Sequence, residues 1–134
     1  MKVKTINEQN YVDLAEKAIL NLKNKVNPKS KKAIPMVTTS KIRNLLSMTA
    51  DIYNHVLILN DDKLNSELMG RIEYLRIRFV YECGREPRVK DFVTEAKILE
   101  VLKEISGSKE NYILFNHYME ALIAFHRFNG GKND

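Results

Sequence analysis

The sequence has almost none of the residues that small proteins use for covalent or metal cross-links. Its 134 residues include one cysteine, Cys83, and no tryptophan. A single cysteine cannot form an intrachain disulfide, and no second thiol is present to complete a zinc site. Cys83 lies close after Phe79, which favours a small, half-buried thiol over a nucleophile. Stability must therefore come from a hydrophobic core, which a chain of this length can bury.

Long apolar runs are also missing. No stretch approaches the roughly 18 continuous apolar residues of a membrane span, and the N-terminus, MKVKTINEQN, lacks the apolar core of a signal peptide. Hydrophobic residues make up 44% of the chain and charged residues 29%, which is typical of a globular protein and not of a disordered one. We therefore expect a cytoplasmic protein with no membrane partner, forming a single helical domain over residues 1–134.

Acidic residues are absent from one segment that is rich in basic ones. The rest of the chain has 15 basic and 17 acidic residues, so this segment holds the whole positive excess of +5. Clusters of Lys and Arg bind phosphates by releasing condensed counterions, which favours a nucleic-acid partner. The alternative is a flexible, solvated loop over residues 23–37, because residues 27–32 also have the composition of a linker. The seven basic residues are Lys23, Lys25, Lys29, Lys31, Lys32, Lys41 and Arg43.

Apolar residues recur at spacings of three and four along most of the chain, which predicts an all-α fold, a compact bundle of about five helices. We expect five helices. The first covers residues 11–22, and the second begins after the hydroxyl residues 38–40 and ends at residue 57. The third runs from the N-cap candidates Asp61 and Asp62 to Gly84, the fourth covers residues 89–105, and the fifth lies between Ser108 and Gly130. Residues 84–87 are predicted to form a turn. The last helix has two apolar faces, which indicates a central helix or a subunit interface. Ile77 is expected on the opposite side of the third helix, which suggests partners on both flanks, either inside a bundle or in another subunit.

The second predicted helix begins with two cations, Lys41 and Arg43, where the helix dipole would favour anions. Together with free backbone N–H groups of the first turn, they would form a cradle for a phosphate. On the third helix, Arg71 and Arg78 are predicted along one edge of the apolar stripe and Arg76 along the other.

Candidates for catalysis or metal binding are few. His117 and Glu120 are three residues apart and could share a metal, but no third ligand is evident. His126 falls on an apolar stripe and is better explained as a hydrogen-bonded core histidine. No set of nucleophile, base and orienting residue is present. We therefore predict a protein that is not an enzyme, with no metal and no cofactor.

Four sequence blocks together resemble a known family. They are TTSKIRNL at residues 38–45, RIRFVYECGR at 76–85, VKDF at 89–92 and YMEALIAFH at 118–126. The chain resembles the small subunit of the type III-A CRISPR effector, the Csm complex, from about residue 11 to residue 131. The resemblance implies an all-helical, non-catalytic subunit of an antiviral ribonucleoprotein, present in several copies along its inner filament. Its partners would be the backbone and large subunits, guide RNA and target RNA. It would hold the RNA duplex through sugar-phosphate contacts, with displaced single-stranded DNA as a further ligand.

The resemblance also implies which cations contact RNA. Lys41, Arg43, Arg76, Arg78 and Arg85 match basic positions of the family. We add Lys32 and Arg71 to these RNA-binding candidates, Lys32 because of its charge and Arg71 because of its place on the third helix.

Two other classes of protein stay open. One is a free-standing dimeric DNA-binding regulator, with a helix-turn-helix at the connection between the second and third helices, although acidic residues 61 and 62 would then lie near phosphate. The other is a protein adaptor whose basic loop is only solvated.

Overall fold

Six α-helices make up most of the computed structural model, which describes residues 4–133. They are α1 (Tyr11–Lys23), α2 (Thr39–Leu57), α3 (Ser66–Arg85), α4 (Pro87–Glu95), α5 (Ile98–Glu104) and α6 (Lys109–Phe128). The described residues form no strand and only two isolated β-bridges. No helix among them is long and apolar enough to cross a membrane. The predicted all-α class is confirmed, with six helices in place of about five.

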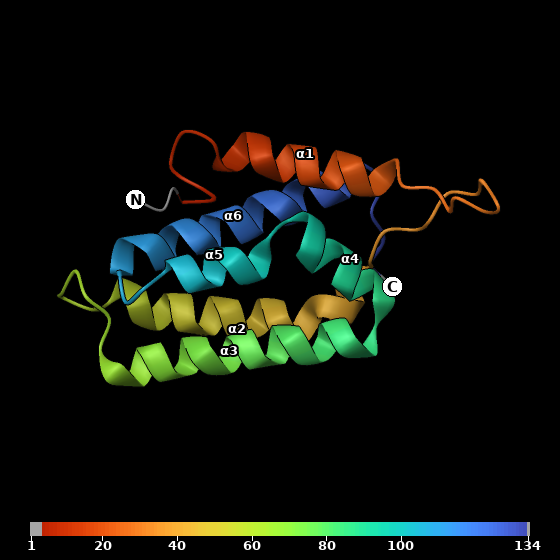
Figure 1. Cartoon of the computed structure of the whole chain (residues 1–134). Coiled ribbons are helices and arrows are strands. Elements are labelled where there is room, and N and C mark those ends of the chain that lie inside the picture. Colours follow the sequence, from red (N-terminus) through yellow and green to blue (C-terminus); the bar gives the residue numbers. More distant parts are fainter. Residues whose placement is uncertain (1–3, 134) are drawn as a thin grey trace.

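The helices stack in the order α1, α6, α2, α3, and α4 and α5 cover one side of this stack (Figure 1). Both apolar faces of α6 are used within the chain. On one face the Tyr112 hydroxyl donates a hydrogen bond to the Thr49 carbonyl of α2, 2.7 Å away, and on another the Tyr118 hydroxyl donates to the Ala96 carbonyl, 2.8 Å away. Helix α6 is therefore the central helix, and of its apolar residues Phe128 at its end is the most exposed, at 85%.

The helix predicted over residues 89–105 is divided in two. Lys97, between α4 and α5, has a left-handed backbone with φ of 55°. In an uninterrupted helix the Ala96 carbonyl would accept the N–H of residue 100, but here it accepts the Tyr118 hydroxyl. No glycine or proline stands near residue 97 to signal this break.

The ends of α3 differ from the prediction. The helix is capped by Asn65, whose side chain accepts the Leu68 N–H at 2.9 Å, and not by Asp61 or Asp62. It also continues through Gly84, so the turn predicted over residues 84–87 is wrong. Helix α3 ends at Arg85, and the single residue Glu86 separates it from Pro87, which begins α4. The predicted N-cap at Ser108 is confirmed by its hydrogen bond from the Asn111 N–H, and Gly130 has the left-handed φ of 87° expected after α6.

Residues 25–34 of the basic segment form a short hairpin. The Asn27 N–H donates to the Lys32 carbonyl at 2.9 Å, and the Ile34 N–H donates to the Lys25 carbonyl at 2.9 Å. The hairpin projects away from the helices at the end of the molecule where the C-terminus lies (Figure 1).

Candidate nucleic-acid interface

The basic segment lies at one end of the helix stack. The hairpin, the start of α2, the end of α3 and the start of α4 all meet there (Figure 1). Lys41 Nζ on α2 lies 3.6 Å from the carboxylate of Glu86, the residue between α3 and α4. Lys25 Nζ at the base of the hairpin lies 3.2 Å from the Asp91 carboxylate of α4. Cations that are far apart in sequence, such as Lys41 and Arg85, are therefore brought to the same end.

Most cations of the basic segment have no acidic partner. All seven are exposed. Of the seven, only Lys25 and Lys41 form ion pairs with acidic residues in the described range, Lys25 with Asp91 and Lys41 with Glu86. Lys32 lies in the hairpin and Arg43 in the first turns of α2, and neither forms an ion pair with an acidic residue of the described range, 4–133. Cations without nearby counter-charges leave a positive potential that attracts polyanions. We call the seven residues the basic end, defined as Lys23, Lys25, Lys29, Lys31, Lys32, Lys41 and Arg43.

The arginines of α3 differ, because each has an acidic neighbour. The pairs of Arg71 and Arg76 are exposed and worth about 1 kcal/mol or less, so a phosphate can replace the carboxylate there. Arg78 and Arg85 share Glu82, whose side chain is 11% exposed, so removing both partners would cost more. The local charge is close to neutral. The pairs are Arg71 with Glu67 (3.0 Å) and Asp51 (3.6 Å), Arg76 with Glu73 (3.2 Å), and both Arg78 (3.2 Å) and Arg85 (3.6 Å) with Glu82. Arg78 also lies over the Tyr81 ring, 4.8 Å from its centroid.

The seven RNA-binding candidates do not form one cluster. Lys32, Lys41 and Arg43 belong to the basic end, and Arg85, at the end of α3, lies at the same end of the helix stack. Arg71 lies 14 residues before Arg85 on the same helix, which places it about 20 Å away. A duplex bound along α3 could contact both ends, whereas a single phosphate could not.

The prediction that free N–H groups at the start of α2 would help to bind a phosphate is wrong, because the first three of these N–H groups already donate hydrogen bonds within the chain. The Thr39 N–H donates to the Lys132 carbonyl at 3.1 Å and the Ser40 N–H to the Asn133 carbonyl at 2.8 Å. The Lys41 N–H donates to the Thr38 carbonyl at 3.2 Å. The C-terminal tail therefore caps α2, and the Thr38 side chain makes no capping bond.

His126 explains how the tail is held. Its side chain is 1% exposed, and its Nε2 lies 2.6 Å from the carbonyl oxygen of Val37, just before α2. The Gly131 N–H donates to the His126 carbonyl at 2.7 Å, and Gly131 packs on the imidazole ring. The prediction of a hydrogen-bonded core histidine is confirmed. His126 therefore joins the tail to the segment that precedes α2.

Known proteins identify the family. The model for "Csm2 Type III-A" matches residues 8–132. The chain belongs to the Csm2 family. The CRISPR system Cms protein Csm2 of Streptococcus thermophilus is 42% identical over 128 residues, covering 96% of this chain and 98% of the relative. The protein of the same name from Mycobacterium tuberculosis (strain CDC 1551 / Oshkosh) is 41% identical over 101 residues, covering 75% and 81%. The predicted resemblance is confirmed, and the chain is a Csm2 small subunit, a component of the multi-subunit type III-A complex.

A helix-turn-helix is not formed by α2 and α3 in this Csm2 family member. The two helices lie antiparallel and side by side, joined by residues 58–65 (Figure 1). A helix-turn-helix needs a turn of about three or four residues and helices that cross at a large angle. The arrangement that the regulator hypothesis required is therefore contradicted at this connection.

The histidine considered for metal binding packs against aromatic rings. His117 lies between Tyr11 and Tyr53, with ring centroids 6.5 and 6.2 Å away. Glu120 instead accepts a hydrogen bond from the Asn116 side chain at 2.7 Å. Within residues 4–133, no three His, Cys, Asp or Glu side chains lie close enough to share a metal ion. Burial raises the pKa of the Cys83 thiol, which makes it a weaker nucleophile.

Proposed function

We propose that this Csm2 subunit holds the guide RNA and target RNA duplex through contacts with the sugar-phosphate backbone and has no catalytic activity of its own. It does so in several copies along the inner filament of the Csm ribonucleoprotein, beside the backbone subunits and below the large subunit, in antiviral defence in the cytoplasm. One observation carries the proposal. The basic end presents seven exposed cations, of which only two are paired with acids among the described residues.

Backbone contacts are sufficient for this role. Pairing with the guide reads the target sequence, so the protein needs to position phosphates and not to read bases. Lys41 and Arg43 project from the first turns of a helix, which holds their positions better than a loop would. Lys32 adds a contact from the hairpin. Displaced single-stranded DNA carries the same phosphates and is a second ligand for the same cations.

The arginines of α3 contribute in a different way. Arg71, Arg76, Arg78 and Arg85 each exchange a carboxylate for a phosphate when RNA binds. This exchange costs little for the exposed pairs of Arg71 and Arg76 and more for Arg78 and Arg85, whose shared partner Glu82 is 11% exposed. The four residues add contacts along the length of the duplex.

The outer face of α3 also supplies the contact between neighbouring subunits. Ile77 is 61% exposed, and Val80 and Tyr81 beside it are exposed as well. Contiguous exposed apolar residues favour a protein partner. The second apolar face of α6, expected to share this role, is instead covered within the chain by α1 and by the α4–α5 junction. Residues 1–134 act as a single domain in this assembly.

The experiment that tests the function is the double substitution Lys41→Glu with Arg43→Glu in the reconstituted complex. We expect weaker retention of target RNA for every target sequence. The salt dependence of log K should fall by about 1.4 to 1.8, which is 0.7 to 0.9 for each of two lost phosphate contacts. Lys103→Glu on the exposed surface of α5 is the matched control. Unchanged retention by a folded, assembled double variant would remove Lys41 and Arg43 from the interface.

A further inference from the structure

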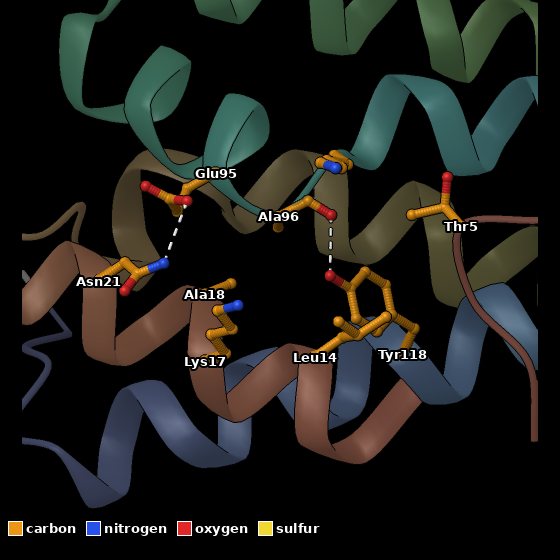
Figure 2. Close-up of a pocket in the computed structure, with 9 residues that line it drawn as sticks. Thr5, Leu14, Lys17, Ala18, Asn21, Glu95, Ala96 and Tyr118 are labelled. Atoms are coloured by element: carbon orange, nitrogen blue, oxygen red, sulfur yellow. Dashed lines mark hydrogen bonds between the residues drawn. The ribbon is translucent and has the colours of Figure 1, made fainter. Parts of the chain in front are cut away.

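A pocket of about 380 Å³ lies between α1, the α4–α5 junction and α6 (Figure 2). Its floor is mainly apolar. Leu14 and Ala18 of α1 form one side, and the Tyr118 ring of α6 closes the bottom. The hydrogen bond from the Tyr118 hydroxyl to the Ala96 carbonyl fixes the ring, as Figure 2 shows. The position of the Tyr118 ring is therefore fixed by contacts within the chain, whereas exposed side chains form the rim.

The rim of this pocket is mainly basic. Lys17 of α1 and Lys97 of the α4–α5 junction both line it, and neither has an acidic partner among the described residues. The one acidic lining residue, Glu95, accepts a long hydrogen bond of 3.4 Å from the Asn21 side chain. The rim thus combines two unpaired ammonium groups with an amide and a carboxylate that can bond to a polar edge of a ligand.

The backbone of Lys97 adds an independent observation. Its φ of 55° is left-handed, a conformation that glycine and asparagine adopt at lower cost than lysine. The Lys97 side chain is exposed, so it does not stabilise the core in return. Unfavourable backbone geometry of this kind is concentrated at functional sites. A use for the ammonium group explains why a lysine occupies this position.

We propose that this pocket binds one nucleotide of single-stranded RNA. The phosphate lies between the ammonium groups of Lys17 and Lys97, and the base lies on the apolar floor with its polar edge toward Asn21 and Glu95. Two unpaired cations select a phosphate, and an apolar floor selects a flat ring over a bare ion. The volume is at the lower end of the range for small-molecule sites, about 300 to 1,000 Å³, which suits a single nucleotide.

The pocket would give the subunit a second RNA contact. It involves α1, whereas the candidate cations of α3 lie across the stack, with α6 and α2 between (Figure 1). The class of ligand rests on the proposed function, but the residues do not overlap with those proposed to hold the duplex. The pocket would hold an unpaired nucleotide that leaves the duplex or precedes it.

The test is a titration of the full ¹⁵N-labelled chain with uridine 5′-monophosphate, followed by amide chemical shifts. We expect saturable shifts at Lys17, Asn21 and Lys97. Lys17→Ala and Lys97→Gly should each weaken binding about fivefold, as expected for one lost charge-assisted contact. Lys97→Gly also relieves the left-handed lysine, so loss of binding in this variant cannot be ascribed to unfolding. Lys103→Ala is the control and should bind as the unsubstituted chain does.

Two comparisons decide whether a nucleotide is the ligand. Inorganic phosphate and uridine should each bind more weakly than the nucleotide. Equal shifts with inorganic phosphate would reduce the pocket to an anion site and overturn the proposal, as would small shifts spread over all surface lysines. The pocket and the proposed function are tested by different variants, so one can fail without the other. The variant Lys41→Glu with Arg43→Glu should keep the nucleotide response, and variants at Lys17 or Lys97 should keep duplex contacts at the basic end.

Discussion

Gly131 lies against the imidazole ring of His126, so closely that a Cβ on Gly131 would be 2.5 Å from Nε2. The ring cannot move aside easily, because it is buried and its Nε2 bonds to the Val37 carbonyl. We therefore expect Gly131→Ala to lower the free energy of unfolding by about 2 kcal/mol, as overpacking usually does. Thermal denaturation measures this change.

A glycine in open space provides the matched control. Gly84 lies inside α3, and a Cβ there would meet no atom within 4 Å. Gly84→Ala should raise the free energy of unfolding by up to about 1 kcal/mol, because alanine favours a helix over glycine. A Gly131→Ala variant as stable as the Gly84→Ala variant would show that the tail does not pack on His126.

The tail contact makes a second prediction, about amide exchange. The N–H groups of Thr39 and Ser40 are bonded to tail carbonyls of Lys132 and Asn133. Deleting residues 132–134 should therefore increase hydrogen exchange at Thr39 and Ser40, and lower the free energy of unfolding by about 1 kcal/mol for the lost helix cap. Amides in the middle of α6 serve as the internal control. Unchanged exchange at residues 39 and 40 would mean that another group caps α2.

The parts of the fold that sequence analysis predicted correctly are those that depend on local patterns. The apolar spacing of three and four located α1, α2 and α6, and the Ser108 cap was recognisable from its residue type. The basic end was visible because its cations all lie in one segment, residues 23–43, that contains no acidic residue. The acidic partners of Arg71, Arg76 and Arg78 could also have been found, because they stand three or four residues away.

Long-range contacts explain what could not be predicted. The break at Lys97 accompanies the Tyr118 hydroxyl on the Ala96 carbonyl, 22 residues apart in sequence. The cap of α2 comes from the tail, more than 90 residues away. Neither contact has a periodic pattern or a local residue signal. The pocket lined by Lys17 and Lys97 depends on the same α4–α5 break, so it could not be recognised before the structure was known.

Tyr118 makes a third prediction, about alkaline pH. Burial raises the pKa of its hydroxyl from 10.0 to about 12. The unfolded state loses this proton at lower pH than the folded state, so the contribution of Tyr118 is complete below about pH 10 and declines as the pH rises toward 12. Tyr118→Phe should make the decline in stability between pH 10 and 12 less steep. Tyr74→Phe on the exposed face of α3 is the control, and equal slopes for the two variants would argue against a buried Tyr118 hydroxyl.

Glu82 makes the fourth prediction, which concerns RNA. Its carboxylate pairs with both Arg78 and Arg85, and its side chain is only 11% exposed. Glu82→Gln should therefore release two cations at once. If these arginines contact phosphate, target RNA retention should rise for all sequences, and the salt slope should steepen by about 0.7 to 0.9 for each new contact. Glu73→Gln, which releases only Arg76, should have the smaller effect. Retention that stays the same or falls in a stably folded Glu82→Gln variant would exclude Arg78 and Arg85 from the RNA interface and leave the basic end to hold the duplex.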